Sequence, residues 1–147
     1  MVWLYLLFAF AGGAALPFQA GINAQLAGWL HSPVRAAFVS FLVGSLVLLV
    51  AAALVFKPLP SWGRLGDAPW WVWIGGALGA FYVAASIVTA PKLGAATLIA
   101  LVVAGQALAS LLVDQFGWVG FEPKHLSAGR AVGMVLVGAG VALVQFF

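Results

Sequence analysis

The sequence contains no cysteine and very few charged residues. Of its 147 residues, 6 are lysine or arginine and 3 are aspartate or glutamate, which is 6% of the chain. Soluble globular domains carry about 25% charged residues, so this composition excludes a soluble domain. The absence of cysteine excludes a disulfide, a thiolate metal site and a cysteine nucleophile. The net charge of +3 forms no basic patch, which argues against a nucleic-acid partner.

Hydrophobic residues make up 65% of the chain. A charged side chain at the centre of a bilayer costs about 2.5–3.5 kcal/mol, so the charges mark the ends of membrane-spanning segments. A spanning helix needs about 20 predominantly apolar residues. The sequence therefore predicts an all-α integral membrane protein, with one transmembrane domain over residues 1–147. We expect five transmembrane helices, at about 3–30, 34–56, 70–90, 93–113 and 128–146, with Ser32 and Ser127 as helix caps.

The first predicted helix combines helix-breaking residues with carboxamides. Pro17 lacks the N–H group that would bond to Gly13, and the pair Gly12 and Gly13 resists bending little. We therefore predict a hinge at Gly12, Gly13 and Pro17. Gln19 and Asn23 are four residues apart and share one helix face. Because polar side chains at membrane depth rarely face lipid, this face is expected to look into a cavity or onto a partner helix.

Further polar and aromatic side chains occur on the later spans. We place a neutral cavity among the first, third and fourth spans, and expect the second span, 34–56, to be peripheral. Interhelical hydrogen bonding or simple packing is the alternative role for each side chain of this predicted cavity. The predicted substrate-binding residues are Gln19, Asn23, Gln106, Phe18, Tyr82, Ser86 and Ser110.

Glycines spaced along the third and fifth predicted helices permit close approach of helix backbones. We expect a dimer to use such contacts, and the candidates are Gly75, Gly79, Gly133, Gly138 and Gly140. Asp114 ends the polar face of the fourth span. We expect it to be solvated at the interface or paired with Lys124 or Arg130, and the alternative is a role in ion coupling. The chain has no metal-ligand spacing, catalytic triad or phosphate loop, so we expect no metal, no cofactor and no enzyme activity.

Several motifs together resemble the YdcZ family of bacterial inner-membrane exporters. They are Pro17 to Leu26, Pro91 to Ala96, Gly105-Gln106 and Asp114 to Gly117, while Gly133 to Leu143 resembles the last helix of small multidrug resistance proteins. The resemblance, which extends to the drug/metabolite transporter superfamily, implies a five-span, multi-pass half-transporter of the bacterial inner membrane that works as a pair, often antiparallel. The membrane glutamate of small multidrug resistance proteins falls on Phe18, beside Gln19. Because a carboxamide does not titrate, proton-coupled antiport is not implied.

The predicted function is export of a small neutral, zwitterionic or charge-delocalised solute by alternating access in a homodimer. In a five-span topology, four lysine and arginine residues lie on one side of the membrane and two on the other. This bias is weak enough to allow insertion in both orientations and an antiparallel pair. Two alternatives remain. One is a non-transporting membrane scaffold or accessory subunit of a hetero-oligomer, and the other is an obligate heterodimer with a separate partner.

Overall fold

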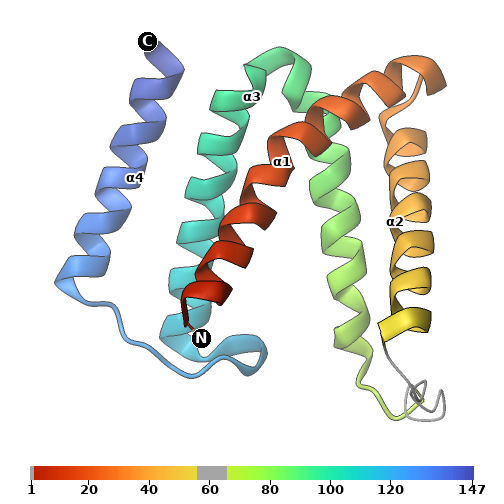
Figure 1. The fold of residues 1–147 in the computed structure, drawn as a ribbon. Coiled ribbons are helices and arrows are strands. Elements are labelled where there is room, and N and C mark those ends of the chain that lie inside the picture. Colours follow the sequence, from red (N-terminus) through yellow and green to blue (C-terminus); the bar gives the residue numbers. More distant parts are fainter. Residues whose placement is uncertain (1, 56–65) are drawn as a thin grey trace. The chain divides into compact units, whose positions relative to one another are not determined.

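The computed structural model describes residues 2–55 and 66–147 as helices joined by short connections (Figure 1). Helix α1 covers Val2–Leu30, α2 covers Pro33–Val55, α3 covers Ile74–Phe116 and α4 covers Ala128–Phe146. The 3-10 helix η2 (Trp70–Trp73) precedes α3, and η3 (Trp118–Gly120) follows it. No strand occurs within these described ranges, so the all-α prediction is confirmed.

Four helices of the described residues are long and apolar enough to cross a membrane. Most of their large apolar side chains are exposed, including Trp3 at 78% and Phe8 at 83%. Exposure of apolar surface to water costs a free energy of about 25 cal/mol per Å², so this much exposed apolar surface is unfavourable in water. Lipid is therefore the surrounding that this surface requires, as expected for an integral membrane protein.

The predicted helix ends agree with α1, α2 and α4 to within a residue or two, and serine caps precede α2 and α4. The N–H of Arg35 donates to Ser32 Oγ at 3.3 Å, and the N–H of Arg130 donates to Ser127 Oγ at 3.3 Å. Each serine thereby satisfies an N–H group that lacks a partner in the first helical turn. The predicted end of the second span, residue 56, lies outside the described residues.

Helix α3 occupies the region in which two separate spans were expected. It consists of two helical segments joined across a kink at Gly94, whose φ is 76° and ψ is 163°. Only glycine adopts this conformation readily, since it has no Cβ. The prediction placed the end of the third span at Pro91, but helical turns continue through Pro91 and Lys92, and the interruption comes three residues later. Pro91 removes one hydrogen bond from the helix but keeps a helical conformation, whereas Gly94 is not in a helical conformation and therefore interrupts the helix.

The chain forms two compact units that share α1 and α3. The α2 unit is Phe18–Lys92, and the α4 unit combines Met1–Pro17 with Leu93–Phe147. The chain passes from one unit to the other directly after Pro17 in α1 and two residues before Gly94 in α3. The prediction of one domain over 1–147 stays a prediction, since neither unit has α1 or α3 to itself.

Small side chains form the core of the α2 unit. Ala36 and Ala37 of α2 and Val83 and Ile87 of α3 are buried together, and α2 runs beside the first part of α3 (Figure 1). Leu26, Ala27 and Leu30 of α1 pack against this cluster. The three helices are thus held together near the turn between α1 and α2, which positions the middle of α1 beside α2.

Replacing Gly94 with alanine should destabilise the fold, because an L-residue in this conformation costs about 1–3 kcal/mol. Gly105→Ala is the matched control, since a Cβ at Gly105 meets nothing within 4 Å. This control should be neutral or stabilise α3 by up to about 1 kcal/mol. Thermal unfolding of both purified variants in one detergent measures the difference. Equal midpoints would show that the break in α3 does not depend on glycine.

Candidate functional site

Gln19 lines a cavity between α1 and α2 in the α2 unit. The cavity measures about 200 Å³ and is open to the surroundings, and the residues that line it are Gln19, Ser40, Phe41, Gly44, Ser45 and Leu48. The α2 members of this set recur at intervals of three and four, so they share one helix face. One carboxamide and two hydroxyls provide both donors and acceptors without a formal charge. The cavity is therefore suited to a small solute that forms hydrogen bonds and carries no net charge.

Helix α2 contributes more to this cavity than its sequence suggested. We expected the second span to be peripheral, yet five of the six lining residues belong to it. Ser40, Gly44 and Ser45 are small, so they scarcely interrupt a strongly apolar run. The one sequence feature that could have indicated this role is that Ser40, Gly44 and Ser45 share a helix face. The prediction did not use it, because it placed only the first, third and fourth spans around the cavity.

Asn23, one helical turn after Gln19, is buried. Its side chain is 4% exposed, and Nδ2 has no hydrogen-bond partner in the part of the chain that the structure describes. A buried polar group left unpaired costs about 1–3 kcal/mol. The two carboxamides therefore differ in environment, because Gln19 reaches a cavity whereas Asn23 holds an unused donor inside the α2 unit.

The other predicted site residues of the α2 unit do not line the Gln19 cavity. Phe18 is 72% exposed, and Tyr82 packs against the core cluster. Ser86 is buried, and its hydroxyl donates to the carbonyl oxygen of Val83 at 2.8 Å. That bond satisfies the hydroxyl within α3, as serine commonly does in helices.

The third carboxamide of α1 reaches a different surface. Gln25 lines an open hollow of about 490 Å³ with Gly28, Trp29 and His31. Gln25 lies two residues beyond Asn23, which places it on a different side of the helix. It therefore serves as an internal comparison for Gln19.

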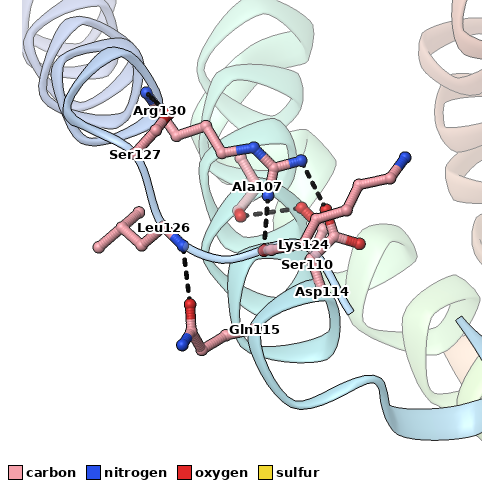
Figure 2. Close-up of polar contacts among 8 residues, drawn as sticks. All are labelled: Ala107, Ser110, Asp114, Gln115, Lys124, Leu126, Ser127 and Arg130. Carbon is pink, nitrogen blue, oxygen red and sulfur yellow. Dashed lines mark hydrogen bonds and ion pairs between the residues drawn. The ribbon is translucent and has the colours of Figure 1, made fainter. Parts of the chain in front are cut away.

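Gln106 and Ser110 lie in the α4 unit and are both exposed. The hydroxyl of Ser110 donates to the carbonyl oxygen of Ala107 at 2.9 Å (Figure 2). Ser110 is thus satisfied within α3, as Ser86 is. Because Gln106 and Gln19 belong to different units, a common role for them stays a prediction.

Asp114 forms an ion pair with Arg130, which links the end of α3 to the start of α4 (Figure 2). Arg130 Nη2 donates to Asp114 Oδ2 at 2.9 Å, and the two side chains are 34% and 26% exposed. Arg130 Nη1 also donates to the carbonyl oxygen of Lys124 at 3.1 Å, and the Lys124 N–H donates to the Asp114 carbonyl oxygen at 2.7 Å. The expected pairing with Arg130 is confirmed. Ion coupling through Asp114 stays a prediction, and the carboxylate has a structural partner that such a role would have to displace.

Gln115, to which the sequence interpretation assigned no role, completes this junction. Its Oε1 accepts from the Leu126 N–H at 2.7 Å, and its Nε2 lies 3.3 Å from His125 Nδ1. Since Oε1 faces an N–H group, Nε2 is the donor and His125 Nδ1 is the acceptor. The turn also needs Gly117, whose φ is 64° and where a Cβ would lie 2.8 Å from Pro123 Cγ. The signals for this role were the motif Asp114 to Gly117, which contains Gln115, and its position just beyond a predicted helix end.

The predicted hinge and dimer glycines lie mostly in open surroundings. Helix α1 is continuous through Pro17, and a Cβ at Gly12 or Gly13 would meet nothing within 4 Å. The same is true of Gly75, Gly133, Gly138 and Gly140. Gly79 differs, because a Cβ there would lie 3.4 Å from Phe41 Cζ of α2 in the same chain. The hinge and dimer roles stay predictions, and Gly79 already has a contact within the chain.

The apolar helices and the uncharged cavity define a multi-pass α-helical membrane protein. The family described as "Putative inner membrane exporter, YdcZ" matches residues 4–143. The "Inner membrane protein YdcZ" of Escherichia coli (strain K12) is 34% identical over 143 residues, which cover 96% of this chain and 94% of that protein. The chain therefore belongs to the YdcZ family and is a multi-pass protein of the inner membrane, as its motifs predicted. No solved structure matches it.

A double-mutant cycle of Asp114→Asn and Arg130→Gln should give a coupling free energy of about 1 kcal/mol, as for other partly exposed ion pairs. Glu122→Gln is the control, because Glu122 is exposed and makes no ion pair within the described residues. Thermal unfolding of the four proteins in low-salt detergent buffer measures the coupling. Additive effects of the two substitutions would show that the pair adds nothing to the α3–α4 junction.

Proposed function

We propose that this protein is a secondary transporter that exports a small neutral, zwitterionic or charge-delocalised organic solute through the Gln19 cavity. The observation that carries the proposal is the convergence of Gln19, Ser40 and Ser45 on one uncharged cavity. Polar groups at membrane depth are costly unless they have partners, and a solute supplies such partners. An ion of one sign would find no opposite charge there, since the cavity has no charged side chain. Membership of an exporter family agrees with this role.

The buried amide of Asn23 supports the same proposal. Its unpaired Nδ2 lies one turn beyond Gln19, on the same face of α1. A donor kept in the interior without a partner lowers stability, so a role outside folding would explain its presence. We infer that the cavity extends by one helical turn along α1 in another conformation, in which Asn23 Nδ2 donates a hydrogen bond to an acceptor atom of the solute. Gln106, Ser86, Ser110, Tyr82 and Phe18 would contact the solute in other conformations of the transport cycle.

We further infer that α3 crosses the membrane twice, which makes five spans. A straight helix of its 43 residues would measure about 65 Å, whereas the hydrocarbon core is about 30 Å thick. The break at Gly94 lies near the middle and separates two segments of spanning length. Five spans place the two ends of the chain on opposite sides of the membrane, and we propose that two such half-transporters pair as an antiparallel homodimer.

Alternating access would use the points at which the chain passes between its compact units. In α1 this point follows Pro17, and in α3 it precedes Gly94. Proline removes one helical hydrogen bond, and the break at Gly94 removes helical continuity. The hinge at Gly12, Gly13 and Pro17 would change the angle of α1, and the open glycine surfaces of α3 and α4 would contact the second copy.

A non-transporting scaffold or accessory subunit is the second candidate function. It is favoured by Ser86 and Ser110, whose hydroxyls bond to carbonyl oxygens of their own helix. Side chains satisfied in this way need no solute. A scaffold, however, requires neither an uncharged cavity beside Gln19 nor a buried amide without a partner.

Gln19→Ala should lower solute affinity at least tenfold, because one lost hydrogen bond at about 1.4 kcal/mol corresponds to that factor. A thermal-shift screen of small neutral and zwitterionic solutes, with purified protein in detergent, finds the ligand, since binding to the folded form raises stability. Flux of that ligand into proteoliposomes should fall in parallel. Gln25→Ala is the matched control and should bind and transport normally. Equal affinity in Gln19→Ala and the wild type would contradict the proposed site.

Asn23→Leu separates a transporter from a scaffold. Removal of an unpaired buried amide should raise the thermal midpoint, because a cost of about 1–3 kcal/mol disappears. The same change should abolish flux of the ligand found by the screen. A scaffold in which Asn23 joins helices predicts the reverse for stability, namely a lower midpoint and dissociation of the assembly.

Cysteine labelling tests the number of spans, because the chain has no native cysteine. With five spans, Val34 and Glu122 lie on opposite sides of the membrane. An impermeant maleimide added to spheroplasts should then modify one thiol in every chain of the double variant Val34→Cys, Glu122→Cys. Four spans would instead give chains with two labels or none. In the single variants, an antiparallel dimer predicts labelling of about half of the chains at each position, and complete labelling at one position would exclude it.

A further inference from the structure

We propose that the end of the α2 unit that carries the turn between α1 and α2 binds the headgroup of an anionic phospholipid. Arg35, Lys92 and the imidazole of His31 hold the phosphate, and Trp29 contacts the glycerol and the upper acyl chain. This surface shares no residue with the Gln19 cavity. It is a second binding site, and its occupancy does not depend on which solute the protein transports.

The turn between α1 and α2 carries two basic residues. His31 directly follows the last residue of α1, and Arg35 lies in the first turn of α2. The N–H of Arg35 donates to Ser32 Oγ at 3.3 Å, which ties the start of α2 to the turn. His31 and Arg35 are both exposed. They are therefore accessible to a ligand at the membrane surface.

Lys92 lies at the same end of the α2 unit. Ala36, directly after Arg35, is buried in one cluster with Ile87 of α3. Lys92 follows Ile87 by five residues, which corresponds to about 7.5 Å along a helix. Its side chain is exposed as well. The contact between α2 and α3 therefore brings Lys92 to the end of the unit that holds Arg35.

No acidic residue of the α2 unit neutralises these cations. Asp67 is the sole acidic residue of Phe18–Lys92, and it precedes α3, whereas Lys92 ends the first segment of that helix. The helix from Ile74 to Lys92 measures roughly 27 Å, while the Debye length is about 8 Å at physiological ionic strength. Neither Arg35 nor Lys92 makes an ion pair within the described residues. This end of the unit therefore has an uncompensated positive charge.

An open hollow begins at His31. It measures about 490 Å³, and Trp29 and His31 are among the residues that line it. Trp29 is 85% exposed. Tryptophan is enriched at the level of lipid headgroups, because its ring is apolar while its N–H group is a hydrogen-bond donor. The hollow thus offers an apolar contact and a donor next to the basic turn, which is the pattern that a phospholipid presents in reverse.

The backbone of His31 has an unusual conformation for a histidine. Its φ is 50°, and the N–H of Ser32 donates to the carbonyl oxygen of Ala27 at 3.2 Å, which closes the end of α1. Glycine is the usual residue at such a helix end, because a left-handed conformation costs other residues free energy. A ligand for the side chain explains a histidine there. The ring N–H groups of histidine are suitable donors for phosphate oxygens.

An anionic phospholipid complements this surface better than a zwitterionic one. Its phosphodiester supplies the negative charge that the α2 unit lacks at this end. A lysine or arginine near an anionic membrane surface adds about fivefold in affinity. A zwitterionic headgroup gains less, since its own positive group is repelled by the same cations. We therefore expect at least a tenfold preference for the anionic headgroup when Arg35 and Lys92 both contribute.

Native mass spectrometry of the detergent-solubilised protein measures this preference. Dioleoylphosphatidylglycerol and dioleoylphosphatidylcholine have the same acyl chains, so the ratio of their dissociation constants isolates the effect of the headgroup. The wild-type protein should bind the first phosphatidylglycerol molecule at least tenfold more tightly than the first phosphatidylcholine molecule. Equal affinities for the two lipids would overturn the proposal.

Charge-removing variants locate the site. Arg35→Gln and Lys92→Gln should each lower the preference about threefold to fivefold, and the double variant should have almost none. Both positions are exposed and helical, and glutamine is a good helix former, so the fold should be retained. Lys124→Gln is the matched control, because it removes an exposed cation of the α4 unit that follows Glu122 by two residues. A preference that persists in the double variant, or that Lys124→Gln lowers equally, would overturn the location.

His31→Gly tests the imidazole without disturbing the turn, because glycine adopts a positive φ freely. This variant should bind phosphatidylglycerol about threefold to fivefold more weakly, while its thermal midpoint in lipid-free detergent should be at least that of the wild type. His31→Asn keeps a side-chain donor and a residue that tolerates the left-handed conformation, so it should recover most of the affinity. Wild-type affinity in His31→Gly would overturn the role of His31.

A soluble headgroup distinguishes a lipid from free phosphate as the ligand. Glycerol 3-phosphate has the phosphate but lacks the acyl chains that contact Trp29. It should fail to displace phosphatidylglycerol when the two are present at equal concentration. Displacement under these conditions would show that the site binds a soluble phosphate compound, and it would overturn the assignment of a lipid.

Discussion

A lipid core offers no hydrogen bonds, and this constraint decides where each polar side chain of the molecule is placed. Serines 86 and 110 meet it by bonding to carbonyl oxygens of their own helix. Asp114 meets it through Arg130 at the junction of α3 and α4. Gln19 lines an open cavity together with two hydroxyls, while Asn23 Nδ2 is buried without a partner in the described part of the chain. An unpaired buried group lowers stability, which makes Asn23 a candidate functional position.

The backbone of the long helices departs from regular geometry at few places. Each departure leaves N–H and C=O groups without their helical partners, so it needs a residue that makes it inexpensive. Gly94 does so in α3, through a conformation that other residues avoid. Pro17 removes a donor in α1 without ending the helix. The chain passes from one compact unit to the other next to these two residues.

Packing in the α2 unit shows how small residues leave a hollow between helices. Alanines 36 and 37 bring α2 close to α1 and α3 in the core. Farther along α2, Ser40, Gly44 and Ser45 leave space where larger side chains would fill the gap, and that space is the cavity. Phe41 fills the remaining volume toward α3, where Gly79 makes room for it. The cavity is thus lined by three small residues of α2 together with the larger side chains of Gln19, Phe41 and Leu48.

The sequence by itself determined the membrane class and the helix starts after Ser32 and Ser127, and it offered Arg130 as one of the alternatives for Asp114, which the structure selects. These features depend on local free energies: the cost of a charge in lipid, the caps of helix ends, and opposite charges that flank a short connection. Tertiary structure alone decided that α2 lines the cavity, that Asn23 is buried while Gln19 is not, and that Gln115 binds the chain after α3. An apolar helix looks alike on every side in its sequence, and only contact with its neighbours decides which face is covered.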